Sequence, residues 1–255
     1  FQPAEEGLGG AVAMLADGLF QRFPCDEIYA LHNWPQAELG RISIKRGVAM
    51  AASDNFDIRV TGRGAHGALP QNSIDAVMVA TTLAQALQTI VSRNVDPIQS
   101  ATVSITQIHA GSAYNVIPEH ATLGGTIRTF TEEVRTLVAQ RMRQIAAGVA
   151  AAYGAKIEVA IEPKFRALRN SAPHSDAALA VAREIVGPDL AVFDAEPKGG
   201  SEDFADMLAA VPGAYLFLGQ GIGPSLHNPR YDFNDAATPI GASLLARLAE
   251  TRSAV

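Results

Sequence analysis

Two adjacent carboxylates, Glu5 and Glu6, stand close to the start of the sequence, after Pro3 and before Gly7. Burial of two neighbouring carboxylates is costly unless a positive charge lies beside them, and a metal ion supplies such a charge. One carboxylate can bind the metal while the other takes a proton from the water that the metal activates. Alternatively, the pair forms the acidic first turn of the following helix, which the helix dipole favours.

Two histidines offer the nitrogen ligands that such a metal would need. His32 comes directly after the apolar run 28–31, at the end of a predicted buried strand, where α/β proteins build their sites. His227 lies in a loop rich in glycine and proline, residues 219–229, and loops on a rigid scaffold often carry ligands. The alternatives are that neighbouring groups satisfy His32 and that His227 is solvated. The histidines that have no such setting are interpreted as structural: His109, His120 and His174.

His66 lies in the segment Gly62 to Gly67, which matches the G-x-G-x-x-G pattern of dinucleotide sites. We reject that function because no helix opens at Gly67 and no second strand ending in an acid follows about twenty residues later. The glycines instead let the backbone turn and present His66 from a loop. Asn115 lies between two predicted strands. Arg128, on the polar side of a strand, could hold a carboxylate through two parallel hydrogen bonds, or it is an exposed strand charge.

The middle of the chain, about residues 53–165, contains predicted elements in the order β-α-β-β-α-β. Alternating apolar and polar residues predict the strands, and apolar residues at helical spacing predict the helices. Asn72 or Ser73 is expected to cap the first helix, and Thr131 the second. This order is typical of a ferredoxin-like fold, in which one four-stranded sheet carries both helices on one face. The predicted elements are strands near 56–61, 101–106, 122–128 and 157–161, and helices near 73–91 and 131–153.

The flanking blocks, residues 1–52 and 166–255, are predicted to form one α/β domain with a mixed sheet, into which the middle block is inserted. Short apolar runs bounded by glycine and proline predict its strands. The predicted elements of the flanking blocks are helices near 11–20, 176–186 and 202–210 and after Pro239, and strands near 28–31, 40–44 and 214–218.

Composition limits the class of protein. The chain has 255 residues, a hydrophobic fraction of 48% and a net charge of −6, which predict a folded protein that binds neither nucleic acid nor anionic membrane. No apolar run reaches the length of a membrane span, and no secretory signal is visible. The single cysteine, Cys25, rules out an internal disulfide and is typical of a reducing compartment, so we expect a cytoplasmic protein.

Taken together, these segments resemble the metal-dependent amidohydrolase and carboxypeptidase family that includes hippurate hydrolases, aminoacylases and indole-acetyl-amino-acid hydrolases. The matching segments span the chain in the family's order. They are Phe1 to Glu6, Leu31 to Pro35, Gly62 to Gly67, Asn115 to Pro118, Gly125 to Arg128, Ser201 to Phe204 and Leu226 to Pro229.

The resemblance implies a role for each candidate residue and a fold for each block. Glu5 would be the general base that activates water, and His66, reaching in from a neighbouring subunit, would stabilise the oxyanion. The flanking blocks would form the catalytic domain, and the inserted block would be a lid and dimerisation domain. Ser201 to Phe204 would support the site. The implied metal ligands are Glu6, His32 and His227, and the implied substrate contacts are His66, Asn115 and Arg128.

The resemblance also implies the reaction, the cofactor and the partners. The reaction would be hydrolysis of the amide bond of N-acyl amino acids, such as hippurate-like substrates or small peptides. The cofactor would be two divalent ions of zinc, manganese, cobalt or nickel, and the protein would be a homodimer.

Members of this family carry, upstream of the segment that contains Glu5, a Cys-Gly-His and a further histidine that supply two more ligands. Cys25 follows Glu6 and lacks this context. We therefore expect the chain to be a fragment of the complete enzyme, with an incomplete catalytic domain. The alternative is a non-catalytic remnant that acts as a dimerisation or interaction module.

Overall fold

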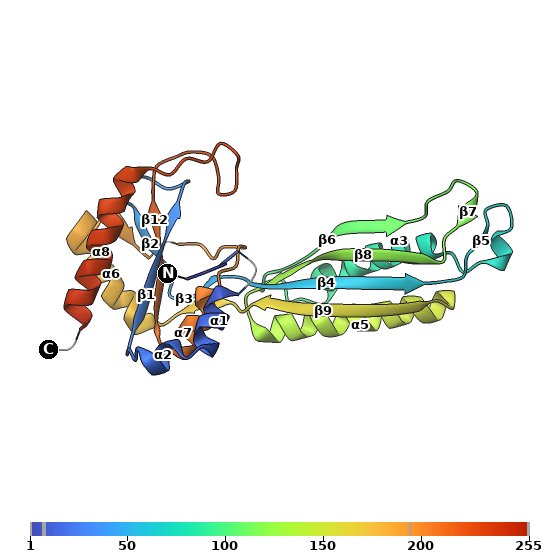
Figure 1. Cartoon of the computed structure of the whole chain (residues 1–255), viewed down its shortest axis with the longest axis horizontal. Helices are drawn as coiled ribbons and strands as arrows, with labels where there is room; N and C mark the ends of the chain where they lie inside the picture. Colours follow the sequence, from blue (N-terminus) through green and yellow to red (C-terminus); the bar gives the residue numbers. More distant parts are fainter. Residues whose placement is uncertain (1, 7–8, 194, 254–255) are drawn as a thin grey trace. The chain divides into compact units, whose positions relative to one another are not determined.

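The chain is described from a computed structural model, which covers residues 2–6, 9–193 and 195–253. Phe1 of the first matching segment lies outside the described residues. The chain forms two compact units (Figure 1). The terminal unit comprises residues 1–50 and 167–255, and the middle unit comprises residues 51–166.

The terminal unit is a mixed α/β structure. Its main sheet has the strand order β1-β12-β2-β11, and a separate antiparallel pair joins β10 to β3. Strand β12 runs parallel to β1 and antiparallel to β2, which confirms the predicted mixed sheet. The elements of this unit are α1 (Gly10–Ala16), α2 (Leu19–Arg22), β1 (Ile28–Trp34), β2 (Ile42–Ile44), β3 (Gly47–Met50), β10 (Leu168–Asn170), α6 (Ala172–Val186), β11 (Ala191–Val192), α7 (Phe204–Ala210), β12 (Gly213–Gly219) and α8 (Thr238–Arg252).

Strand β12 is buried along its whole length because hydrophobic clusters cover both of its faces. Leu216 and Leu218 pack into the cluster that contains residues of α6 and α8. Tyr215 and Phe217, which point to the opposite face, pack into the cluster that contains residues of α1 and α7. The sheet is therefore the middle layer between two pairs of helices (Figure 1).

The single helix predicted over residues 11–20 was wrong, because the structure has two short helices there. Helix α1 ends at Ala16 and α2 begins at Leu19. Between them Gly18 adopts a φ of 81°, a left-handed conformation that breaks the helix and that glycine adopts without strain. The buried strand predicted over 28–31 is longer than expected, since β1 continues to Trp34 and contains His32.

The middle unit is built on one antiparallel sheet with the strand order β6-β8-β4-β9, and a two-stranded pair joins β5 to β7. Strand β4 pairs along its whole length with β8 and along most of it with β9. The elements of this unit are β4 (Ala52–Thr61), β5 (Ala65–His66), α3 (Ala76–Leu87), α4 (Thr89–Arg93), β6 (Ala101–Ala110), β7 (Val116–Ile117), β8 (His120–Thr129), α5 (Glu132–Tyr153) and β9 (Lys156–Phe165).

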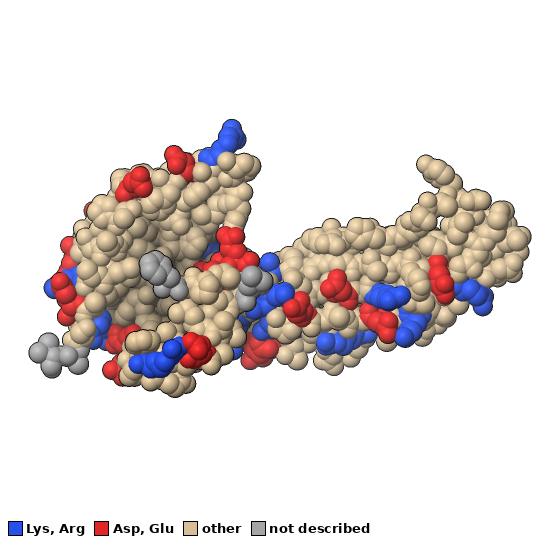
Figure 2. Space-filling view, in the orientation of Figure 1, with Lys and Arg blue, Asp and Glu red and all other residues tan. Residues whose placement is uncertain are grey.

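Both long helices of the middle unit pack on the face of the sheet to which Phe56, Ile58 and Val60 point (Figure 1). The opposite positions of β4, including Asp57 and Arg59, are exposed, as the alternation predicted. In the view of Figure 2, charged side chains of both signs gather on the lower half of this unit, and the upper half of the same face carries few.

Two of the predicted helix boundaries in the middle unit were confirmed and one was wrong. The Thr131 side chain accepts a hydrogen bond from the Val134 amide, and Gly154 ends α5 with a φ of 68°. Helix α3, however, is capped by Asp75, whose side chain accepts from the amide of Val77 at 2.9 Å. Asn72 and Ser73 cannot cap it because they belong to a preceding turn of 3-10 helix and its end.

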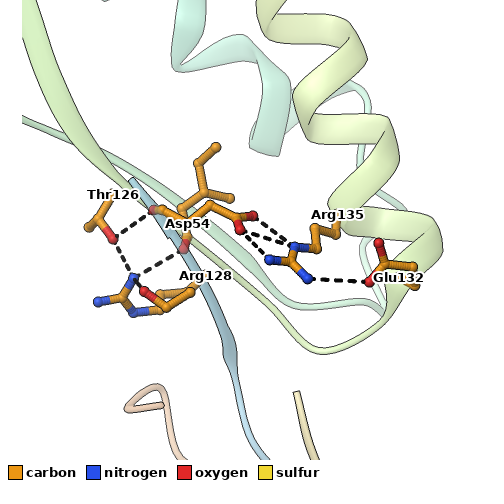
Figure 3. Close-up of polar contacts among 7 residues, drawn as sticks. Asp54, Thr126, Arg128, Glu132 and Arg135 are labelled. Carbon is orange, nitrogen blue, oxygen red and sulfur yellow. Dashed lines mark hydrogen bonds and ion pairs between the residues drawn. The ribbon is translucent and has the colours of Figure 1, made fainter. Parts of the chain in front are cut away.

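Next to the ends of β4 and β8, the Asp54 carboxylate is buried and paired with Arg135 of α5 (Figure 3). The Arg135 Nε donates to both carboxylate oxygens, at 3.1 and 2.9 Å, and Nη2 donates to one of them. Such a pair needs these several hydrogen bonds to offset the cost of removing both charges from water. The pair joins the first strand of this unit to its second long helix.

Among the helices that the structure describes, none combines the length and the apolar character that a membrane crossing requires.

A matched pair of glycine substitutions tests the packing of the middle unit. A Cβ on Gly125 of β8 would lie 2.0 Å from the carbonyl oxygen of Ser104 and 2.5 Å from the ring of buried Phe56. Gly125→Ala should therefore lower the free energy of unfolding by about 3 kcal/mol or more. A Cβ on Gly148, which is exposed in α5, would meet nothing within 4 Å.

The control Gly148→Ala should raise the free energy of unfolding by about 1 kcal/mol, because alanine loses less backbone entropy in a helix than glycine does. Urea denaturation monitored by circular dichroism measures both changes. Equal effects of the two substitutions would contradict the close approach of β6, β8 and Phe56.

A second test concerns Glu27, which joins the start of β1 to the end of α8. Hydrogen bonds from Arg252 and from the Tyr29 hydroxyl lower the pKa of Glu27 to about 2. Because this pKa lies below the unfolded value, the pair stabilises the fold at neutral pH, and this stabilisation is lost as pH falls from about 4.5 towards 2. The Arg252 side chain is 40% exposed, so solvent screening holds the effect to about 1 kcal/mol.

Glu27→Gln should therefore lower the free energy of unfolding at pH 7 and should have little effect near pH 2. Urea unfolding at the two pH values measures this difference. Glu184→Gln, which removes an exposed pairing with Arg247, serves as the control and should change stability less. A Glu27→Gln effect of equal size at both pH values would show that charge is not its source.

Candidate active site

The carboxylates Glu5 and Glu6 lie in a turn that precedes α1. Helix α1 begins only at Gly10 and has no acidic residue in its first turn, so the interpretation of the pair as a helix start was wrong. Ala4, just before the pair, has a φ of 52°, which is the left-handed region that alanine adopts only at a cost of about 1 kcal/mol or more. This unusual backbone turns the chain so that Glu5 is half-buried while Glu6 is exposed.

Glu5 lies in a group of three carboxylates. Ligand oxygens of Glu5, Glu202 and Asp203 all lie within 4.8 Å of one another. Burial raises the pKa of Glu5 to about 7, and the negative charges of Glu202, Asp203 and Glu6 add to the effect. A carboxyl group with a pKa near neutrality can accept a proton and release it again in one reaction cycle, as general acid–base catalysis requires.

Glu6 and His227 lie next to each other, as the predicted ligand set requires. The Nδ1 atom of His227 is 3.8 Å from a carboxylate oxygen of Glu6, and both side chains are more than 70% exposed. His227 has a φ of 63°, so its loop holds it in a conformation that few residues other than glycine adopt. A carboxylate and an imidazole on open, adjacent positions are ligands that divalent transition metals accept.

The third predicted ligand, His32, is half-buried in β1. Its Nδ1 atom lies 2.7 Å from the backbone carbonyl oxygen of Asn33. Because a carbonyl only accepts, Nδ1 carries the proton and Nε2 keeps a free lone pair, which is the tautomer of a histidine ligand. The His32 ring lies near two aromatic rings, with centroids 6.4 Å away at Trp34 and 6.3 Å away at Tyr215.

The predicted trio is only partly assembled. The structure brings Glu6 to His227, whereas the group of three acidic or histidine side chains close enough to share one ion, within the described ranges, is Glu5 with Glu202 and Asp203. The two histidines differ in their surroundings. His227 lies on an exposed loop beside Glu6, whereas His32 lies in β1 near the rings of Trp34 and Tyr215.

The structure shows contacts of Glu202 and Asp203 that the sequence did not predict. The carboxylate of Asp203 accepts hydrogen bonds from the Gln2 side chain and from the Ala11 amide. The carboxylate of Glu202 accepts from the Tyr215 hydroxyl at 2.6 Å. Burial and, after it, the negative charge of Glu202 raise the pKa of Tyr215, so its hydroxyl stays a donor. The only sequence signal for these contacts was the likeness of Ser201 to Phe204 to a supporting segment.

In the middle unit, His66 and Asn115 are neighbours. His66 lies in β5 and pairs with Val116 of β7, so it belongs to a short strand and not to a loop as expected. The amide of Gly67 donates to the carbonyl of Asn115 at 2.7 Å. The amide of Ala68 donates to Nδ1 of His66 at 3.1 Å, so Nδ1 holds the lone pair and Nε2 carries the proton.

Arg128 lies on the face of β8 opposite the helices (Figure 3). Its Nη1 donates to the hydroxyl groups of Ser53 and Thr126 and to the carbonyl of Ile127. The side chain is partly buried and burial lowers its pKa, so the alternative of an exposed strand charge was wrong. No described residue accepts a hydrogen bond from its Nε or Nη2.

Comparison with protein families and curated proteins identifies relatives of the whole chain. The model of peptidase family M20/M25/M40 matches residues 1–251. Hippurate hydrolase of Campylobacter jejuni is 41% identical over 249 residues, which cover 98% of this chain and 65% of that protein. N-acetylcysteine deacetylase of Bacillus subtilis is 36% identical and is covered to 64%. The chain thus spans just under two thirds of these relatives.

Solved structures share the same fold. A dinuclear metal-binding peptidase of the M20 family from Bacillus subtilis, YXEP, superposes with a TM-score of 0.84 at 32% identity, covering 99% of this chain and 64% of that one. An aminohydrolase from Staphylococcus aureus superposes with a TM-score of 0.88 at 24% identity, covering 97% of this chain and 64% of that one, and supports the fold alone. The chain belongs to the peptidase family M20/M25/M40.

Proposed function

We propose that the protein hydrolyses the amide bond of N-acyl amino acids, with hippurate-like compounds as the substrate class. The observation that carries this proposal is geometric: the half-buried Glu5 directly precedes a carboxylate, Glu6, that lies 3.8 Å from the imidazole of His227. The names of two relatives, a hippurate hydrolase and an N-acetylcysteine deacetylase, describe cleavage of the same kind of bond.

The donor types of Glu6, His32 and His227 suit a divalent metal, although in this structure only Glu6 and His227 lie beside each other. Glu6 and His227 are adjacent and open, and His32 keeps the lone pair of Nε2 free. We assign these three residues as metal ligands, and the likeness to a dinuclear metal-binding peptidase supports a centre of two ions such as zinc, manganese, cobalt or nickel. When bound, such ions polarise the scissile carbonyl and lower the pKa of water.

Glu5 then serves as the proton shuttle. Its carboxylate takes a proton from the attacking water and later gives it to the leaving amine, and both transfers need a pKa near the working pH. The neighbouring carboxylates of Glu202 and Asp203 keep Glu5 from becoming a stronger acid, since a second negative charge nearby disfavours ionisation.

The polar groups of the middle unit would act on the substrate. His66 presents an Nε2–H donor, which suits stabilisation of the negative charge that develops on the carbonyl oxygen. The Nε and Nη2 atoms of Arg128 present two parallel donors to a substrate carboxylate, and Asn115 offers its side-chain amide. This assignment makes the middle unit a ferredoxin-like lid inserted into the catalytic domain.

The same unit is our candidate for a homodimer contact. Strand β6 lies at the edge of its sheet, and its residues 106–110 are exposed. An edge strand leaves backbone donors and acceptors unpaired, so it is a natural place for a second copy to add its own strand. In such a dimer His66 would reach the active site of the neighbouring subunit. A cytoplasmic location remains a prediction from the single cysteine.

A substitution of Glu5 tests its proposed role as the general base. Glu5→Gln removes the proton acceptor but keeps the size and shape of the side chain. Hydrolysis of hippurate by the complete protein should fall by about 10²–10⁴-fold, while metal content measured by atomic emission should stay the same. Retained hydrolysis in this variant would remove Glu5 from the mechanism.

Metal content of the unmodified protein distinguishes a metal-dependent enzyme from the alternative, a non-catalytic dimerisation or interaction module. Bound metal and hydrolysis, both abolished by a chelator and restored by adding back the ion, are the expected results. A stable dimer that holds no metal and cleaves no hippurate would instead favour a non-catalytic interaction module.

A substitution of His66 tests its proposed role in stabilising the oxyanion. His66→Ala should lower kcat by about 10²–10³-fold, because it removes a donor to the developing oxyanion, and should leave metal content unchanged. His120→Ala is the matched control, since His120 is an exposed histidine on β8 of the same unit and has no proposed role. Equal rates for the two variants would refute the oxyanion role of His66.

A further inference from the structure

We propose that Asp203 and Tyr215 are positioning residues of the active site: Asp203 fixes the turn that carries Glu5 and Glu6, and Tyr215, held by Glu202, fixes the ring of His32. The inference rests on the proposed function, because it assigns these residues to the same site. It gives the segment Ser201 to Phe204 two separate tasks, one at the turn that carries Glu5 and Glu6 and one at the ring of His32.

Asp203 holds the chain on both sides of the two catalytic carboxylates. Its side chain is buried, with 0% exposure. The Gln2 side-chain amide donates to both of its oxygens, and the Ala11 amide donates to Oδ2 at 2.9 Å. Gln2 precedes the turn and Ala11 follows it, so one carboxylate ties together the two ends of the segment that carries Glu5 and Glu6.

The hydrogen bond to Ala11 also replaces a missing helix cap. Helix α1 has Gly9 at its N-cap position, and glycine offers no side-chain acceptor to the first free amides. Asp203, far away in the sequence, accepts from one of them instead. The start of α1 therefore depends on Asp203 in a way that a local cap would have made unnecessary.

A close backbone contact shows how tightly the same segment is closed. A Cβ on Gly10 would lie 1.5 Å from the carbonyl oxygen of Pro3, so only glycine permits this approach. The backbone of Gly10 thus lies against that of Pro3, and the described turn with Glu5 and Glu6 follows Ala4, which has a left-handed conformation. Asp203 restrains the chain on both sides of this turn, through its hydrogen bonds from Gln2 and from the Ala11 amide.

On the other side of the site, Glu202 acts through Tyr215. Glu202 is 8% exposed and accepts from the Tyr215 hydroxyl at 2.6 Å and from the Phe204 amide at 3.2 Å. The Tyr215 ring is thereby fixed at both ends, since its backbone amide also donates to the side chain of Asn170. This fixed ring lies 6.3 Å from the ring of His32 and limits how His32 can turn.

Burial of Glu202 and Asp203 beside Glu5 costs free energy, and hydrogen bonds offset part of that cost. Glu202 and Asp203 are buried carboxylates close to Glu5, and repulsion among three such groups disfavours the fold. Hydrogen bonds from four donors offset part of that cost: Gln2, Ala11, Tyr215 and Phe204. Gln2 and Ala11 flank the turn that carries Glu5 and Glu6, and the Tyr215 ring lies 6.3 Å from the ring of His32, so three of the four donors lie beside proposed site residues.

The experiment for Asp203 combines hydrogen exchange with metal affinity. Asp203→Asn keeps the size of the side chain but offers one acceptor oxygen and an NH₂ group in place of two acceptors. Exchange of the Ala11 amide, followed by mass spectrometry of the peptide that contains it, should become faster. Co²⁺ affinity, followed by isothermal titration, should fall by about 10–100-fold, as for other changes behind metal ligands.

Two further variants keep this test decisive. Gln2→Ala alters an exposed residue and removes one arm of the same contact, so it should weaken Co²⁺ binding even if Asp203→Asn does not fold. Asp176→Asn removes a negative charge from an exposed position of α6 in the same unit and should change neither readout. Faster exchange with unchanged Co²⁺ affinity would show that Asp203 is only structural and would overturn the proposal for it.

Tyr215→Phe tests the proposal that Tyr215, held by Glu202, fixes the ring of His32. It removes the hydroxyl that Glu202 holds and should shift the NMR signals of the His32 ring and weaken Co²⁺ binding, while exchange at Ala11 stays as in the unmodified protein. Unchanged His32 signals and Co²⁺ affinity would overturn the role of Tyr215. If the unmodified protein takes up no Co²⁺, the proposed function fails, whereas exchange and the His32 signals still decide whether these contacts position the turn and the ring.

Discussion

The crowding of negative charge around Glu5 is the constraint on which the rest of the site depends. Glu5, Glu202 and Asp203 approach within 4.8 Å, and Glu6 adds a further charge next to them. Burial and repulsion raise the pKa of Glu5 to about 7, where it can exchange protons in both directions. A divalent ion beside Glu6 would supply the positive charge that such a group of carboxylates needs.

Backbone hydrogen bonds fix opposite tautomers of His32 in the terminal unit and His66 in the middle unit. The Asn33 carbonyl fixes the proton of His32 on Nδ1 and leaves the lone pair on Nε2, as the proposed role of His32 as a metal ligand requires. The Ala68 amide does the reverse at His66, which leaves an N–H for an anionic oxygen. Arg128 follows the same logic, because Nη1 is held by Ser53 and Thr126 while the rest of its guanidinium has no acceptor among the described residues.

Sequence reasoning recovered what short-range patterns encode. Alternation predicted β4, and Thr131 and Gly154 marked the ends of α5 correctly. It failed where distant residues decide: Asp203 caps α1 from another part of the chain, and Gly18 splits a helix that its apolar spacing favours. Contacts between distant residues also explain why the sequence did not predict the supporting contacts of the site. The sequence could suggest Glu6 and His227 separately, but neither Asp203 nor Tyr215 has a neighbour in sequence that reveals its contacts.

The central claim is that one cation centre lies among Glu6, His32 and His227 while Glu5 stays free to move a proton. The most direct measurement is an anomalous difference map, at the zinc absorption edge, from crystals of the protein grown with zinc. The account predicts a peak in contact with the side chains of Glu6, His32 and His227. A peak held instead by Glu202 and Asp203, or no peak near any of these residues, would contradict it.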